Sequence, residues 1–108
     1  NKRNEEGKEE AEANVEGGAA MSPSVIVQTV GLAKQAFEGK DYANAALLFL
    51  KAANADNPLA QGALGLMYLD GKGVEKDLDE AFRWLWAGAC AQDGPAMRGL
   101  ATMYLEGL

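Results

Sequence analysis

The chain has 108 residues, which is enough for one small domain, and 48% of them are hydrophobic, which is enough to form a core. Its 10 Lys and Arg residues against 16 Asp and Glu residues give a net charge of −6, and an acidic chain lacks the basic surface that nucleic acid requires. No apolar run is long enough to span a membrane, so no membrane-spanning helix is expected.

Residues 1–20 differ in composition from the rest of the chain, with six Glu, three Lys or Arg and no aromatic residue. Such a segment cannot bury enough apolar area to offset the entropy lost on ordering, so an extended acidic tail is predicted. Two alternatives stay open, a short weakly ordered helix and a tail ordered by a partner, and we expect the second. Because the chain begins with Asn1 rather than methionine, we expect a processed product or a fragment, with an organelle as one candidate compartment.

Residues 21–108 are expected to form one helical domain, and its first two helices have recognisable starts. The first, over residues 23–38, begins with Ser22 as an N-cap and Pro23 at the first helical position. The second, over residues 41–55, begins at Asp41. The short connection between them predicts an antiparallel pair.

The third and fourth helices repeat these start signals. Asn57 and Pro58 again place a capping side chain before a proline. Asp77 is followed three residues later by Glu80, a spacing that resembles a capping box. The two helices are predicted to cover residues 58–70 and 77–92.

The fifth helix, over residues 95–106, follows Asp93 and Gly94, a looser version of the same start. Pro23, Pro58 and Pro95 are 35 and 37 residues apart, which suggests an internal repeat. No segment alternates apolar and polar residues as a strand would. The sequence therefore predicts an all-α fold.

A shift of 36 residues places segment 41–72 on segment 77–108 and confirms the repeat within the sequence. Ten of the 32 aligned positions are then identical. We expect a short α-solenoid of about two and a half repeats of antiparallel helix pairs, because one pair cannot bury its apolar face alone. The identical pairs are Asp41/Asp77, Ala45/Ala81, Ala53/Ala89, Ala55/Ala91, Ala60/Ala96, Leu64/Leu100, Met67/Met103, Tyr68/Tyr104, Leu69/Leu105 and Gly71/Gly107.

Helical spacing also predicts which side chains face the core. On each of the two best-defined helices, apolar residues recur on one face at 3.6 residues per turn. Small residues among them allow neighbouring helices to approach closely. The predicted core positions are Ala60, Ala63, Leu64 and Met67 on the third helix, and Leu78, Ala81, Phe82, Leu85 and Ala89 on the fourth.

These residues resemble the Sel-one-like repeat, a tetratricopeptide-like helical repeat of about 36 residues. The third copy has Ala101 where the pattern has Gly, and the first pair departs further, with Leu48 where the pattern has Trp. The resemblance implies an adaptor or assembly subunit that binds other proteins. The positions that match the pattern in unbroken register are Ala60, Leu64, Gly65, Tyr68, Gly71, Gly73, Val74, Asp77, Ala81 and Trp84.

The segment Gly71-Lys72-Gly73 invites comparison with a phosphate-binding loop, but the surrounding residues do not fit. A Walker loop has Gly five residues before its second Gly and Ser or Thr after the Lys, where this chain has Leu66 and Gly73. Such a loop also follows a strand, whereas this one follows a predicted helix. We therefore interpret Gly71 as a helix C-cap with positive φ.

No catalytic or cofactor-binding constellation is found. The chain has no histidine, which removes the commonest general base and metal ligand. Its single cysteine, Cys90, has no candidate base and is predicted to lie away from the core. Asp77 and Asp79 fit a helix start better than a metal site, because they complement the helix dipole. We expect no enzyme activity, no cofactor and no metal.

An apolar stripe outside the expected core is the candidate interface. Leu47 and Leu50 project from the far side and flank of the second helix, and Trp86 lies one repeat after Leu50. Exposed apolar residues, tryptophan above all, often mark binding surfaces. The alternative is that Trp86 packs against the next helix of the stack and leaves only the two leucines exposed.

The last helix has no partner helix in the sequence, so Met97, Leu100 and Tyr104 are expected to need cover from further residues or from another protein. We expect a non-catalytic scaffold, most simply a small accessory or linker subunit whose partners are other protein subunits. The alternative is a repeat fragment of a larger regulatory protein or enzyme whose active domain lies elsewhere.

Overall fold

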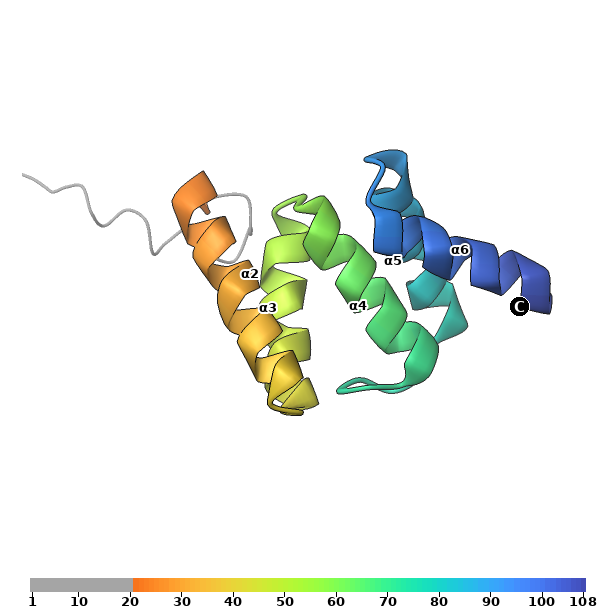
Figure 1. Ribbon diagram of the computed structural model, residues 1–108, viewed down its shortest axis with the longest axis horizontal. Helices are drawn as coiled ribbons and strands as arrows, with labels where there is room; N and C mark the ends of the chain where they lie inside the picture. Colours follow the sequence, from red (N-terminus) through yellow and green to blue (C-terminus); the bar gives the residue numbers. More distant parts are fainter. Residues whose placement is uncertain (1–20) are drawn as a thin grey trace, which may run out of the picture.

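A computed structural model describes residues 21–108, and this part of the chain consists of five helices without a strand. The all-α prediction is therefore confirmed, while the predicted tail lies outside the described residues. Each helix follows its neighbour along the long axis, from α2 at one end to α6 at the other (Figure 1). The helices are α2 (Pro23–Glu38), α3 (Tyr42–Asn54), α4 (Pro58–Asp70), α5 (Leu78–Cys90) and α6 (Gly94–Glu106).

All five helices begin at a side chain that accepts a hydrogen bond from the backbone of the first turn. Ser22 accepts from the N–H of Val25, and Asn57 accepts from the N–H of Ala60 at 2.9 Å. These side chains satisfy donors that the helix itself leaves unpaired. The other N-caps are Asp41, Asp77 and Asp93, so the second, fourth and fifth helices start one residue from the predicted positions.

The predicted capping box at α5 is only half formed. Asp77 accepts from the N–H groups of Asp79 and Glu80, at 3.0 and 3.1 Å. The carboxylate of Glu80 does not return to the cap, because it pairs with Arg83 at 2.7 Å.

The five helix ends share one geometry, which no residue pattern in the sequence predicted. Each helix closes with a backbone bond from residue i to the carbonyl of residue i−5, after a residue with positive φ. In the three short turns the residue that donates this bond is also the N-cap of the next helix, so one residue ends a helix and starts another. These residues are Asp41, Asn57 and Asp93.

The α4–α5 loop is longer and crosses the start of α3. Gly71 and Gly73 both have positive φ, at 72° and 74°, as the C-cap interpretation predicts for Gly71. A Cβ added to Gly73 would collide with the backbone carbonyl of Tyr42, so the loop lies directly on α3. Val74 then packs against the core, and the N–H of Asp77 donates to the carbonyl of Tyr68 at 3.1 Å.

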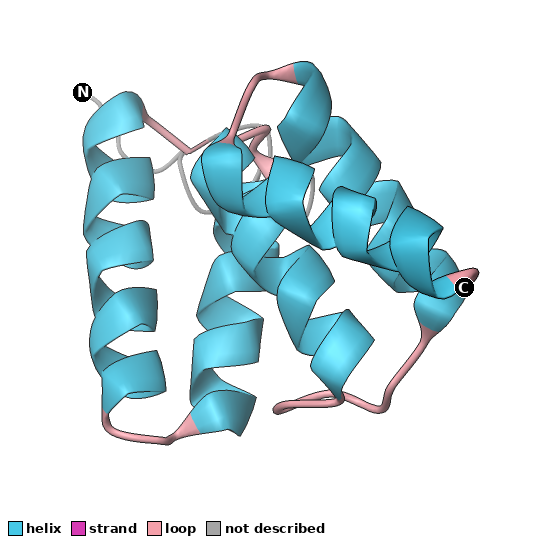
Figure 2. Ribbon diagram, turned by 45° about the vertical axis from the view of Figure 1, so that its right-hand side comes forward, coloured by secondary structure: helices cyan, strands magenta, loops and turns pink. Residues whose placement is uncertain are grey.

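The core has two clusters that meet at α4. The first lies among α2, α3 and α4 and contains the buried Phe49, Leu64 and Met67. The second lies between α5 and α6 and is centred on Leu85. Tyr68 packs against both clusters, which makes α4 the shared wall of a continuous stack. The same stacking is visible from a second direction (Figure 2).

Close approach of α4 and α5 depends on a glycine at their contact. A Cβ on Gly65 would lie 2.9 Å from the backbone nitrogen of Leu85, closer than real Cβ contacts. Leu78 is half-buried and Ala81 is buried, as expected for this face of α5, but Phe82 is exposed. The prediction for Phe82 was wrong because α6 covers only part of the α5 surface.

Candidate functional site

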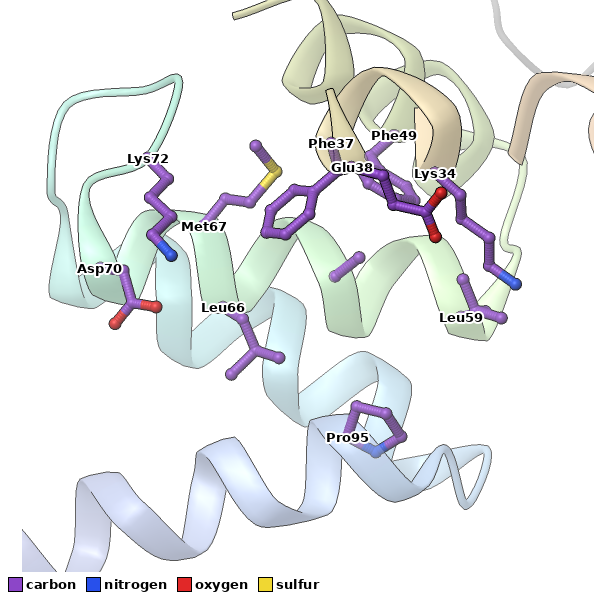
Figure 3. A pocket seen from close by; sticks show the side chains of 11 residues that line it. Lys34, Phe37, Glu38, Phe49, Leu59, Leu66, Met67, Asp70, Lys72 and Pro95 are labelled. Atoms are coloured by element: carbon purple, nitrogen blue, oxygen red, sulfur yellow. The ribbon is translucent and has the colours of Figure 1, made fainter. Parts of the chain in front are cut away.

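An open apolar groove of about 500 Å³ lies on the surface of the described residues. One wall of the groove comes from α2 and the opposite wall from the start of α6, while α4 forms the floor (Figure 3). It therefore involves the first helix of each successive pair. The lining residues are Lys34, Phe37, Glu38, Phe49, Leu59, Ala63, Leu66, Met67, Asp70, Lys72 and Pro95.

The floor of the groove is a stripe along one side of α4. Leu59, Ala63, Leu66 and Asp70 are spaced by four, three and four residues, so they follow one helical face. Met67 lies beside them and points toward Phe37 of α2 (Figure 3). Leu59 and Leu66 retain exposed surface while packing on the helix, so the floor presents carbon atoms to solvent.

Charged groups of both signs stand at the rim. Lys34 and Glu38 come from α2, and Asp70 and Lys72 from the end of α4 and its loop. Among residues 21–108, none of the four forms an ion pair with another. The groove therefore combines an apolar floor with charges of both signs at its rim.

Lys72, the residue that invited the phosphate-loop comparison, is directed at aromatic rings. Its Nζ lies 5.7 Å from the ring centroid of Phe37 and 5.4 Å from that of Tyr42. The two rings meet edge to face, with centroids 5.0 Å apart. The ammonium group thus ties the α4–α5 loop to α2 and α3 through cation–π contacts.

Replacing Lys72 with alanine is expected to lower the free energy of unfolding by about 0.5–1 kcal/mol, the usual value of an exposed cation–π contact. Urea denaturation followed by circular dichroism measures the change. Lys72→Arg keeps a cation over both rings and serves as the matched control, with stability close to that of the parent chain. Equal stability of the alanine variant would contradict the contribution of this contact.

The predicted stripe of Leu47, Leu50 and Trp86 is not a single surface. Leu50 is half-buried and packs against the first core cluster, so its assignment to an outer stripe was wrong. Its flank is covered because the helices of successive pairs stack side by side. Leu47 is 60% exposed and Trp86 is 51% exposed, and neither lines the groove.

The α6 residues divide between core and surface. Leu100 is buried against α5 in the second cluster, so the expectation that it needs outside cover was wrong. Met97 and Tyr104 are exposed, as that expectation requires. Tyr104 meets Phe82 edge to face at 6.4 Å, and Phe82 stacks with Trp86 at 6.0 Å. These three rings form an exposed aromatic row.

The ten residues that carry the repeat pattern are distributed between core, turns and caps. Ala60, Leu64, Gly65 and Ala81 are buried at helix contacts. Tyr68, Val74 and Trp84 are half-buried and pack on the first cluster. The remaining three, Gly71, Gly73 and Asp77, shape the α4–α5 loop and cap α5.

Groups with catalytic potential do not converge in the described residues. Cys90 is free and exposed at the end of α5. Within residues 21–108 no cluster of three or more potential metal ligands occurs. No helix in that range is long and apolar enough to cross a membrane.

Comparison with known proteins places this arrangement in a family. The Sel1 repeat profile matches residues 33–57, 58–92 and 94–108, which together make up most of the chain. The chain belongs to the Sel1 repeat family. This confirms both the resemblance seen in the sequence and the solenoid architecture.

Two similar proteins show how far the likeness extends. A Sel1 repeat protein from Oxalobacter formigenes, known from its crystal structure, matches with a TM-score of 0.72 and 29% identity over 92% of this chain and 46% of that one. Chitin synthase regulator SKT5 from Saccharomyces cerevisiae is 40% identical over 70 residues, which is 65% of this chain and 10% of the yeast protein. This Sel1 repeat chain therefore spans less than half the length of either.

Family membership also bears on the kind of function. Sel1 repeats generally mediate protein–protein interaction, and Sel1 repeat proteins are typically non-catalytic scaffolds. The groove was missed from the sequence because only the core face of α4 was considered. The stripe of Leu59, Ala63 and Leu66, which borders that face and shares Ala63 with it, is the signal that could have revealed the groove.

Proposed function

We propose that this Sel1 repeat chain is a non-catalytic interaction scaffold that binds an apolar segment of a partner protein in the α2–α4–α6 groove. The observation that supports this most directly is the apolar floor of the open groove, whose volume is about 500 Å³. A soluble protein gains nothing from leaving such a surface in water, so contiguous exposed apolar patches commonly mark binding sites. Phe37 from α2, Leu66 from α4 and Pro95 from α6 supply contacts from three helices at once.

The groove suits an extended or helical polypeptide better than a small polar metabolite. Its floor offers carbon atoms, and its polar groups are charged side chains at the rim rather than convergent donors and acceptors inside. Lys34 and Lys72 favour acidic groups on the ligand, and Glu38 and Asp70 favour basic ones. A segment with apolar side chains along its middle and a charged residue near each end would suit this groove. A charge of either sign finds an opposite charge on the rim, since Lys34 lies near Glu38 in sequence and Asp70 near Lys72.

At the level of the whole protein, we propose a small accessory or linker subunit of a larger assembly, whose partners are other protein subunits. The net charge of −6 favours neutral or basic protein surfaces. The alternative is a repeat region of a larger regulatory protein or enzyme. The match to chitin synthase regulator SKT5, which covers 10% of that protein, supports this alternative.

A photo-crosslinking amino acid placed at Leu59 is the sharpest way to identify the partner. Leu59 lines the groove and is partly exposed, so the probe can be accommodated without disturbing the core. Crosslinks in the native assembly should map to one apolar segment of one protein. The same probe at Leu47, which lies outside the groove, serves as the comparison. Crosslinking from Leu47 but not from Leu59 would show that the exposed surface of α3 around Leu47 binds instead.

With the partner segment in hand, Leu59→Asp is expected to weaken its binding about tenfold or more, because a carboxylate in an apolar contact must be desolvated. Isothermal titration calorimetry measures the change. Leu32→Asp is the matched control, since Leu32 is an exposed α2 leucine that does not line the groove. Equal losses from both substitutions would argue against the groove as the binding site.

A further inference from the structure

The side chains of the α2–α4–α6 groove offer few hydrogen-bonding partners to the backbone of a bound polypeptide. Among the described residues that line the groove, every side chain is either apolar or charged, and none carries an amide or a hydroxyl group. The charged side chains, Lys34, Glu38, Asp70 and Lys72, stand at the rim. A backbone that lies along the floor between them therefore meets carbon atoms instead of donors and acceptors.

The main chain of the floor is also unable to pair with a ligand. Residues 63–67 lie inside α4, where the N–H and C=O groups bond to neighbouring turns of the same helix. At the end of this stretch the carbonyl of Met67 accepts from the N–H groups of Gly71 and Lys72, at 2.7 and 2.9 Å. Residues 21–108 contain no strand, so the groove has no sheet edge to which an extended peptide could add.

The lack of free donors and acceptors decides which conformation of a polypeptide fits this groove. An extended segment would bury its own N–H and C=O groups against carbon atoms, and each buried group without a partner lowers the affinity. A helix pairs the same groups internally and presents only side chains to the floor. The groove therefore favours a helical segment over an extended one.

The length of the floor sets the length of the bound helix. Leu59 is near the start of α4 and Asp70 is its last residue, and the eleven residues between these positions correspond to about 16 Å at the rise of an α-helix. A bound helix of about three turns covers the same distance. Its apolar side chains must recur at i, i+3, i+4 and i+7 if they are to contact the floor together.

The end of the groove at Asp70 favours a basic group on the bound helix. Asp70 is exposed, and among residues 21–108 it forms no ion pair. The nearby Lys72 directs its Nζ at the rings of Phe37 and Tyr42, at 5.7 and 5.4 Å from their centroids. The C-terminus of α4 adds partial negative charge at this end. The net charge of −6 acts in the same direction over the whole chain.

We propose that the segment bound in the α2–α4–α6 groove is a basic amphipathic helix of about three turns from the partner protein. Its apolar face packs on Leu59, Ala63 and Leu66. A lysine or arginine beyond that apolar face pairs with Asp70. This inference rests on the proposed function, because it specifies the conformation, the residue spacing and the charge of the ligand in the same groove.

A synthetic alanine-based peptide tests the conformation directly. It carries leucines at i, i+3, i+4 and i+7, and a lysine at i+11, which is the separation of Leu59 from Asp70. Glutamines on its outer face keep it soluble, and fluorescein labels its N-terminus. A matched peptide replaces two outer-face alanines with glycine and keeps every residue that would contact the groove. Fluorescence anisotropy follows the binding of both peptides to the full 108-residue chain.

The glycine peptide is expected to bind about tenfold more weakly or worse, since each glycine disfavours a helix about fivefold relative to alanine. A peptide bound in an extended conformation would lose little from the same change. Leu59→Asp in the chain should weaken binding of the alanine peptide about tenfold, because the new carboxylate must be desolvated. Leu32→Asp, at an exposed position outside the groove, should leave the affinity unchanged.

An exchange of charges tests the pairing with Asp70. Replacing the lysine of the peptide with glutamate should weaken binding to the parent chain about threefold or more, and Asp70→Lys should restore it. A lysine at the C-terminus of α4 suits the helix dipole, so Asp70→Lys should keep the melting temperature of the parent. Glu106→Lys is the matched control, because Glu106 is exposed and ends α6 as Asp70 ends α4, but does not line the groove.

The outcomes separate this inference from the proposed function. Equal affinity of the alanine and glycine peptides, with both weakened by Leu59→Asp, would overturn the helical conformation and leave the groove as a polypeptide-binding site. Failure of Asp70→Lys to restore binding of the glutamate peptide would overturn the assigned charge pairing. Binding by neither peptide, or binding that Leu59→Asp does not alter, would overturn the inference as a whole. Crosslinking from Leu59 in the native assembly would then decide separately whether the groove binds a partner.

Discussion

Replacing Leu85 with alanine is expected to lower the free energy of unfolding by about 3 kcal/mol, within the usual 2–5 kcal/mol for a buried leucine. Leu85 is completely buried, and it contacts α4 at Gly65 and α6 at Gly99. Its removal leaves a cavity where three helices meet, and glycines supply no side chains that could move in to fill it. A loss of this size is a large fraction of the stability of a small domain.

Urea denaturation followed by circular dichroism measures the effect, with fluorescence of Trp84 and Trp86 as a second probe. Leu47→Ala is the matched control, because Leu47 is 60% exposed on α3 and should change stability by less than about 0.5 kcal/mol. Coincident transitions from both probes would show that the two clusters unfold together, as Tyr68 packing on both predicts. A loss below about 1 kcal/mol for Leu85→Ala would contradict the central position of this residue.

Gly73→Ala is expected to cost a similar amount, about 3 kcal/mol, for a different reason. The backbone there has φ of 74°, which costs a residue with a Cβ roughly 1–2 kcal/mol. The added Cβ would also collide with the carbonyl of Tyr42, so the loop must move off α3. Movement of the loop would displace Val74 from the first cluster and Lys72 from its aromatic contacts.

Substitutions at two further glycines separate the cost of the positive φ from the cost of the collision with Tyr42. Gly107 has φ of 73° but no neighbour near its would-be Cβ, so Gly107→Ala should show only the conformational cost of roughly 1–2 kcal/mol. Gly31 lies inside α2 with open space around it, so Gly31→Ala should stabilise the chain by about 0.5–1 kcal/mol. Thermal melts of the three variants give this order directly. Equal losses of stability in Gly73→Ala and Gly107→Ala would show that the contact of Gly73 with Tyr42 does not contribute to stability.

The predictions for Leu85 and Gly73 both concern contacts that hold neighbouring helices together, and the proposed binding groove depends on those contacts. The groove exists because α2, α4 and the start of α6 are held at a fixed spacing by the helices behind them. Gly65 sets the distance of α5 from α4, and the loop through Gly73 fixes α4 relative to α3. Variants at these positions should therefore impair partner binding through loss of structure, which the groove variant Leu59→Asp avoids.

Much of the fold could be predicted from the sequence because the signals were local and repeated. Proline and capping residues marked the helix starts, and Gly71 marked the end of α4. The 36-residue repeat then placed the helices in antiparallel pairs. Lys40, Asp56 and Gln92 adopt positive φ without being glycine, and of these only aspartate is a residue type that favours this conformation. They are held there by the bonds that close each helix and by the start of the next.

The candidate surfaces were harder to predict, as Leu50 and Phe82 show. Both occupy apolar positions on a helix, and periodicity alone put Leu50 outside and Phe82 inside. The structure reverses both, since Leu50 is covered by the next pair and Phe82 has no such cover. The sequence by itself determined the helices, their pairing and the family, because these follow from residue preferences within one repeat. Only the tertiary structure decided which faces remain exposed, because exposure depends on the neighbours that stacking brings to each helix.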